Sequence, residues 1–191
     1  MTRTAHTRRT IGPRTAFLAI ALIVGSTLAS CGGSASPARS TIADGQVLPV
    51  ASNPITNSST VQALKIDSIL VENNVDSAGK TASDHLEIAL SNIGSTELTA
   101  FEVFYTYTDP ATNISENYYA KLPADFTIPA GGRRAAHFDS TGAPDHFPVN
   151  QFSLYYTDTN ALDVSVTVSA IGSAVQTSTV HKDAGGAETA D

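Results

Sequence analysis

Strict alternation of apolar and polar residues is the pattern that most restricts what this chain can fold into. It is clearest at 162–169, where Leu162, Val164, Val166 and Val168 alternate with Asp, Ser and Thr residues. A period of two puts every second side chain on the same side of an extended chain, so this segment predicts a β-strand with one buried face. Similar patterns, some of them weaker, recur at 86–90, 101–107, 118–122, 134–138 and 152–156.

The first predicted strand, at 64–71, has an alternation that changes phase. Leu64 and Ile66 fall on one face, whereas Ile69 and Val71 fall on the other, with Ser68 between them. Either a β-bulge or a strand that switches between two sheets explains such a change.

Seven strands within about 110 residues predict an all-β fold, a single antiparallel β-sandwich over 61–171. Clusters of Asn, Asp, Gly and Pro separate the strands, as turns require. No segment has the periodicity of a useful helix. Residues 172–191 have a low density of apolar side chains, so we expect a tail without stable structure.

The chain begins with the pattern of an export signal. Arg3, Arg8, Arg9 and Arg14 precede an apolar stretch at 16–24, and no acidic residue lies among them. The apolar part is shorter than the roughly 20 residues that a membrane-spanning helix needs. The segment at 7–11 also resembles a twin-arginine motif, and both Sec and Tat export remain open.

The signal ends in Leu28, Ala29, Ser30 and Cys31, and Cys31 is the single cysteine of the chain. This sequence resembles the lipobox of bacterial lipoproteins. The resemblance implies that residues 1–30 are a signal peptide, that Cys31 receives a diacylglyceryl group, and that a peptidase cuts just before it. Two acyl chains are about what stable attachment requires. We therefore expect a protein anchored by its lipid to the extracytoplasmic face of a bacterial cell membrane.

Removal of the signal makes the chain strongly acidic. All 18 acidic residues follow Cys31 but only seven of the 11 basic residues do, which gives a formal charge of −11. Such a polyanion is a poor candidate for nucleic-acid binding. Acylation also uses the only thiol, which leaves none for a disulfide, a cysteine nucleophile or a zinc site built on cysteines.

Residues 31–60 are rich in Ser, Thr, Asn, Gly and Pro. This composition is typical of a flexible linker, and we expect it to tether the sandwich to the lipid.

A second resemblance covers roughly 61–170. An Asn-x-Gly turn at 92–94 precedes a long aromatic strand at 98–109, and Ile-Pro-Ala-Gly at 128–131 leads into a strand that ends at Phe138. With Phe-Ser-Leu-Tyr at 152–155, these features resemble the bacterial immunoglobulin-like domains of the FxLYD type. Tyr156 stands where that type has an acidic residue. The resemblance implies that the predicted sandwich is immunoglobulin-like, and it implies no reaction.

The sequence contains no nucleophile elbow, no zinc-protease helix motif and no phosphate-binding or dinucleotide-binding loop motif. We therefore predict that the chain is not an enzyme and needs no cofactor. Metal ligands are the open alternative. Imidazoles and carboxylates that suit zinc or copper occur at Asp84, His85, His137, Asp139, Asp145 and His146. Carboxylates at 76–84 and at 158–163 suit calcium or, more simply, turns.

An aromatic patch is the predicted binding site. If the odd-numbered residues of 101–107 face the core, Phe104 faces outward, and by the same argument Tyr155 and one of the pair Tyr118 and Tyr119 also face outward. Phe104, Tyr119 and Tyr155 would then form a surface for a protein or a carbohydrate ring. The sequence thus predicts a non-catalytic binding or accessory module for a protein or envelope polymer, and the alternative is a lipoprotein that binds a small ligand or a metal.

Overall fold

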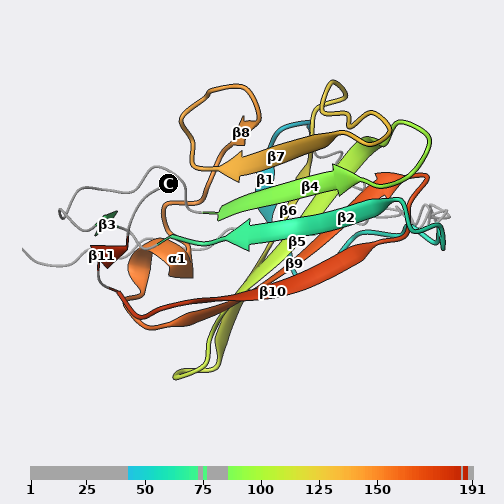
Figure 1. The fold of residues 1–191 in the computed structure, drawn as a ribbon. Coiled ribbons are helices and arrows are strands. Elements are labelled where there is room, and N and C mark those ends of the chain that lie inside the picture. Colours follow the sequence, from blue (N-terminus) through green and yellow to red (C-terminus); the bar gives the residue numbers. More distant parts are fainter. Residues whose placement is uncertain (1–42, 73–74, 77–85, 186, 189–191) are drawn as a thin grey trace, which may run out of the picture. The chain divides into compact units, whose positions relative to one another are not determined.

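The computed structural model describes residues 43–72, 75–76, 86–185 and 187–188 (Figure 1). The signal peptide, the lipobox and Cys31 lie outside the described residues, as do Asp84 and His85. The chain divides into a unit that ends at Arg39 and a unit that begins at Ser40, and the second is the one described here.

The described residues form a β-sandwich, which confirms the predicted fold class. A five-stranded sheet has the order β1-β6-β5-β9-β10, and a four-stranded sheet has the order β2-β4-β7-β8. The strands of these sheets are β1 (Val47–Pro49), β2 (Leu64–Leu70), β4 (Leu86–Asn92), β5 (Thr99–Asp109), β6 (Ile114–Lys121), β7 (Arg133–Phe138), β8 (His146–Phe147), β9 (Leu162–Ile171) and β10 (Gln176–Lys182). A short parallel pair, β3 (Val75–Asp76) and β11 (Ala187–Glu188), and the single-turn helix α1 (Leu154–Thr157) complete the elements.

The order of the strands is that of an immunoglobulin-like sandwich. The first, second and fifth long strands, β2, β4 and β7, form one layer, and β6, β5, β9 and β10 form the other. Figure 1 shows the two layers facing each other. The alternation in the sequence matches the buried face of each strand, because Val103 and Tyr105 of β5 and Val164 and Val166 of β9 are buried between the sheets.

The change of phase in the first strand is a β-bulge. Ile66 pairs with Leu90 and Ser68 pairs with Ala89, so Asp67 is the extra residue. The extra residue reverses the alternation of side chains along the strand, so Ile69 faces the same layer as Ile66. The sequence predicted this irregularity correctly.

The predicted linker and tail both contribute to the sandwich. β1 lies within the predicted linker and pairs antiparallel with β6, and the Asn57 side chain donates hydrogen bonds to Ser169 Oγ (2.9 Å) and to the carbonyls of Ala170 (3.0 Å) and Ser173 (2.9 Å). β10 lies within the predicted tail and pairs with β9. Edge strands of this kind need little apolar content, because only one of their faces packs on the core.

The prediction of a strand at 152–156 is wrong. Leu154–Thr157 forms α1, and its first amide donates a hydrogen bond to Glu116 Oε2 of β6 (2.9 Å). This carboxylate satisfies one of the amides that the start of a helix leaves without a backbone partner. The seventh long strand of the sandwich is therefore β10 rather than 152–156.

Candidate functional site

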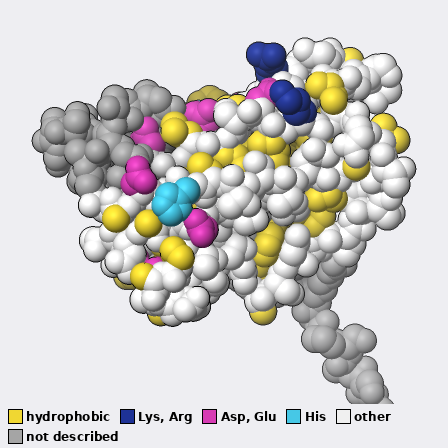
Figure 2. Space-filling view, turned by 60° about the horizontal axis from the view of Figure 1, so that its bottom comes forward, with side chains coloured by type: hydrophobic (Ala, Val, Ile, Leu, Met, Phe, Trp, Pro, Cys, Tyr) yellow, Lys and Arg dark blue, Asp and Glu magenta, His cyan; other side chains and the backbone are white. Residues whose placement is uncertain are grey.

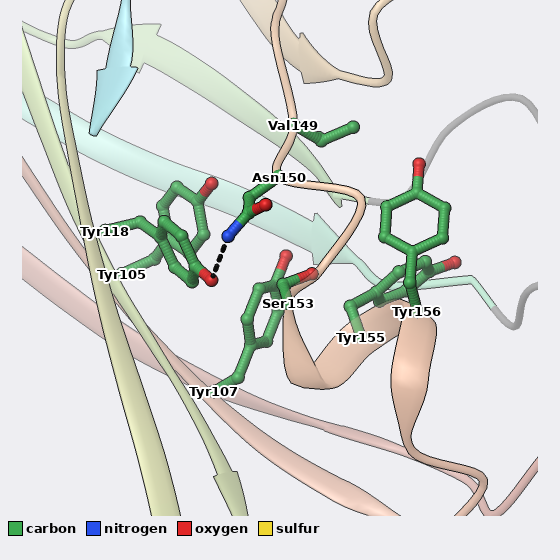
Figure 3. Close-up of a pocket in the computed structure, with 8 residues that line it drawn as sticks. All are labelled: Tyr105, Tyr107, Tyr118, Val149, Asn150, Ser153, Tyr155 and Tyr156. Atoms are coloured by element: carbon green, nitrogen blue, oxygen red, sulfur yellow. Dashed lines mark hydrogen bonds between the residues drawn. The ribbon is translucent and has the colours of Figure 1, made fainter. Parts of the chain in front are cut away.

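A cluster of five tyrosines lies where α1 packs against β5 and β6 (Figure 3). Tyr105 stacks on Tyr118 with ring centroids 5.3 Å apart, and Tyr107 approaches Tyr155 at 6.1 Å. Tyr155 in turn packs edge-on against Tyr156 at 5.3 Å. The rings leave essentially no free volume between them, so this cluster is packed interior rather than a ligand site.

Two hydrogen bonds hold the hydroxyl group of Tyr118 in this cluster. Tyr118 donates its hydroxyl to Glu116 Oε2 (2.8 Å) and accepts a hydrogen bond from Asn150 Nδ2 (3.1 Å), which Figure 3 shows as a dashed line. Burial raises the pKa of Tyr105 and Tyr107 well above the usual value. Burial also raises the pKa of Tyr118 and of Tyr156 to about 12. The cluster is therefore uncharged at neutral pH.

The tyrosine cluster predicts a loss of stability in alkaline solution. An unfolded phenol ionises near pH 10, whereas the folded phenols keep their protons, so the folded chain binds more protons above about pH 10. We expect the midpoint of thermal unfolding to fall by more than about 5 °C between pH 9 and 11, followed by circular dichroism. Phenolate absorbance should rise together with unfolding. A full rise in a chain that remains folded would show that the rings are accessible.

The predicted aromatic patch does not exist as a unit. Phe104 and Tyr119 are directly paired across β5 and β6 on the outer face of the five-stranded sheet, as predicted. Tyr155, however, is 1% exposed, because it belongs to α1 and points into the tyrosine cluster. Tyr119 is also buried, since Leu48 of β1 lies opposite it and its hydroxyl is bonded to Glu102. Of the three residues, half-buried Phe104 is the most accessible.

The outer face around Phe104 is rich in hydroxyl groups. Thr167 of β9 is the cross-strand neighbour of Phe104, and its Oγ1 lies 3.1 Å from Oγ1 of Thr177 on β10. Two rows further along this face, Thr108 and Ser115 are hydrogen-bonded at 2.9 Å. Figure 2, which views the molecule from below Figure 1, shows hydrophobic side chains in strips between uncharged surface rather than as one broad patch.

Exposed apolar side chains gather at the end of the sandwich opposite α1. Val61, Ile93 and Ile171 are each more than half exposed. They belong to one group of connected turns, because the amide of Ile93 donates to the carbonyl of Ala63 (2.7 Å) and the amide of Ala174 donates to that of Val61 (2.6 Å). The sequence pattern did not indicate this group, since its members are far apart along the chain and each stands alone among polar residues.

Two of the predicted metal-ligating histidines lie side by side. His137 of β7 and His146 of β8 are paired in register, and their rings stack at 4.5 Å with an angle of 10° between their planes. Their nitrogen lone pairs lie in two parallel planes, so they do not converge on one ion at the 2.0–2.1 Å that zinc requires. Among the described residues, no group of three or more His, Cys, Asp or Glu side chains is placed to hold a metal ion.

Carboxylates orient both histidines. His146 Nδ1 is 2.6 Å from Asp139 Oδ2, and His137 Nδ1 is 3.7 Å from Glu87 Oε2. A carboxylate can only accept, so Nδ1 of His146 carries a proton, and in the neutral imidazole Nε2 is then the acceptor nitrogen. Asp139 Oδ1 also accepts the amide of Thr141 (2.9 Å), which ties the imidazole to the turn after β7.

The candidate calcium ligands are occupied by local bonds. Asp158 Oδ1 accepts the amide of Asn160 (2.9 Å), as in an Asx turn, and Asp163 Oδ1 is 2.8 Å from Nδ1 of His181. Hydrogen bonds from Thr112 and Asn160 hold the pKa of Asp109 well below its usual range. Most of the acidic run at 76–84 lies outside the described residues.

No protein-family model and no curated protein matches the chain. Among solved structures, the chain is similar to a red sea bream transglutaminase at a TM-score of 0.36 and 12% sequence identity. The match covers 64% of this chain and 17% of the transglutaminase, so the chain spans less than a fifth of that protein's length. A likeness at this level carries no information on activity. The described part of the chain contains no helix long and apolar enough to cross a bilayer.

Proposed function

We propose that the chain is a lipid-anchored, non-catalytic binding module on the extracytoplasmic face of a bacterial cell membrane. The observation that carries this proposal is the sequence from Leu28 to Cys31, which follows an arginine-rich start and an apolar stretch and so resembles a lipoprotein signal. The absence of known catalytic motifs from the sequence favours binding over catalysis.

The position of the sandwich in the chain supports a domain held close to the lipid. β1 begins at Val47 and is already part of the five-stranded sheet. Fifteen residues lie between Cys31 and Val47, and a fully extended chain of that length reaches at most about 55 Å. A module anchored in this way can reach only partners within the first layers of the envelope.

The surface supports binding rather than attachment of the sandwich itself to lipid. The chain that follows the signal has a formal charge of −11, which disfavours contact with anionic headgroups. The exposed apolar group at Val61, Ile93 and Ile171 and the hydroxyl-rich face around Phe104 are surfaces of the kind that contact a protein or an envelope polymer.

Fractionation of a bacterial host tests the anchor. The full chain should be recovered with membranes as a processed species that incorporates a labelled fatty acid. Cys31→Ser should remain uncleaved or be released, and Ser30→Ala, which keeps a small residue before the cysteine, should behave as the unmodified chain does. A processed and acylated Cys31→Ser protein in the membrane fraction would overturn the proposal.

A further inference from the structure

A shallow pocket of about 260 Å³ lies beside the turn that joins β7 to β8. Pro123, Phe126, Ala143 and Pro144 form its apolar walls, and its polar groups come from Asp125, Arg134, Asp145 and His146. Ser140, Gly142 and Asp145 have positive φ angles of 65°, 75° and 66°, and this backbone folds the turn back so that β8 runs parallel to β7. The turn thereby brings Asp145 and His146 to the same side as Arg134.

Arg134 is fixed in one orientation at the pocket. Its Nε donates to Asp145 Oδ2 (2.8 Å) and its Nη2 to Asp145 Oδ1 (2.6 Å), while Nη1 donates to the carbonyls of Asp125 (2.7 Å) and Thr127 (3.2 Å). The guanidinium also stacks on Phe126, with Cζ 4.4 Å from the ring centroid. Four of the five N–H groups are used, so one on Nη2 remains for a ligand.

The other polar groups of the pocket are acceptors. Each carboxylate oxygen of Asp145 accepts one bond from Arg134 and retains a lone pair. In the described part of the chain, neither the exposed Asp125 carboxylate nor Nε2 of His146 has a hydrogen-bond partner. The bidentate pair of Arg134 and Asp145 thus offers one donor beside several acceptors.

This set of groups selects the chemistry of a ligand. Two carboxylates against one guanidinium leave an excess of negative charge, which disfavours phosphate, sulfate and carboxylate ligands. A hydroxyl both donates and accepts, so neighbouring hydroxyls on one ring match the Arg134 and Asp145 pair. The proline walls suit the C–H face of such a ring. The volume lies just below the usual range for ligand pockets, which fits a single ring rather than a longer molecule.

We propose that the pocket at Arg134, Asp145 and His146 binds one neutral, hydroxyl-rich ring, a sugar unit such as the end of an envelope polysaccharide. This inference deepens the proposed function, on which it rests for the location of the protein, and it names the class of envelope partner. The predicted Phe104 surface is not part of this site.

Nuclear magnetic resonance of the full chain in detergent tests the proposal with monosaccharides as probes. Glucose, galactose, mannose, arabinose and N-acetylglucosamine are titrated up to about 50 mM, which covers the weak affinities expected for a single small ring. We expect at least one sugar to shift the Nε–H signal of Arg134 and the amide signals of Asp125 and Asp145. Glucose 6-phosphate should bind at least about tenfold more weakly than glucose because of the carboxylates.

Variants separate the pocket from the rest of the surface. Ala143→Phe fills the pocket from an exposed position and should weaken sugar binding at least tenfold, and Asp125→Asn should weaken it about threefold to tenfold. Asp163→Asn, on β9 in the other sheet, is the matched control and should bind as the unmodified chain does. Unchanged thermal unfolding of each variant shows that the fold is intact.

The proposal is overturned if no sugar shifts these signals, if Ala143→Phe binds sugar normally, or if putrescine binds more tightly than every sugar, since that would identify a cation site. The outcomes are independent of the anchor. A chain that is acylated at Cys31 but binds no sugar contradicts this inference alone, whereas a chain that binds sugar but is not acylated contradicts the proposed function.

Discussion

Replacement of Tyr155 by alanine is expected to lower the free energy of unfolding by about 3–5 kcal/mol. The side chain is 1% exposed and packs between Tyr107 and Tyr156, and Lys182 Nζ lies 5.7 Å from the centre of its ring. Its hydroxyl donates a hydrogen bond to the carbonyl of Glu72, two residues after the end of β2. The substitution therefore opens a cavity between α1 and the sandwich and removes a buried hydrogen bond. Urea unfolding followed by circular dichroism measures the loss.

Two variants make the Tyr155 result specific. Tyr155→Phe keeps the ring and should cost only about 1–2 kcal/mol, the value of a buried hydrogen bond. Phe152→Ala changes a nearby side chain that is 83% exposed and should cost less than about 0.5 kcal/mol. If Tyr155→Ala also cost less than about 1 kcal/mol, Tyr155 would be a surface residue, as the alternation of 152–156 predicted.

Asn92→Ala is expected to lower the free energy of unfolding by about 3 kcal/mol. Asn92 is 1% exposed, and its Nδ2 donates to the carbonyls of Thr96 (2.7 Å) and Ile128 (2.9 Å). Its Oδ1 accepts the amide of Gly94 (2.9 Å), where the turn passes so close to Ala63 that an added Cβ would lie 2.7 Å from the Ala63 Cβ. One side chain thus holds the β4–β5 turn and its contact with Ile128, which forms an isolated bridge with Leu98.

Asn92→Asp distinguishes the hydrogen bonds of Asn92 from its shape. The aspartate keeps the acceptor for Gly94 but places a carboxylate oxygen against two carbonyls, so we expect at least as large a loss as for alanine. Asn53→Ala is the matched control, because Asn53 is exposed and bonds only the amide of Ile55, and it should cost less than about 0.5 kcal/mol. Losses below about 1 kcal/mol for both changes at position 92 would contradict this role.

The sandwich was predictable because alternation reports burial directly. Each long strand of the core, such as β5 and β9, has one face in contact with the other sheet, and that contact requires an apolar residue at every second position. The bulge at Asp67 was predictable for the same reason, since an extra residue shifts the phase of the pattern.

The elements that sequence analysis missed are held by other forces. Five residues at 152–156 fit one turn of helix as well as a short strand, and the bond from Leu154 to Glu116 decides between them. β10 contributes few apolar side chains. The segment around Asn57 is fixed by three hydrogen bonds from the Asn57 side chain, whose acceptors are more than 100 residues away. No local pattern contains such partners.

The candidate site was less predictable than the fold. Alternation gave the correct face for Phe104 and Tyr119, but their accessibility depends on β1, which covers Tyr119 from the predicted linker. The pocket at Arg134 depends on the turn after β7, where three residues have positive φ angles. This turn brings the Asp145 carboxylate within hydrogen-bond distance of the Arg134 guanidinium. The sequence offered Asp145 and His146 only as possible metal ligands.

The attachment of residues 43–57 determines how a mechanical load enters the domain. If the chain is anchored at Cys31 as proposed, tension along it would reach the pairing of β1 with β6 and the bonds of Asn57 before it reaches the strands that form the core. Release of this segment would lengthen the connection by up to about 50 Å. It would remove β1 from the five-stranded sheet, whereas the other strands of both sheets could stay paired. We therefore expect residues 43–57 to detach first under load.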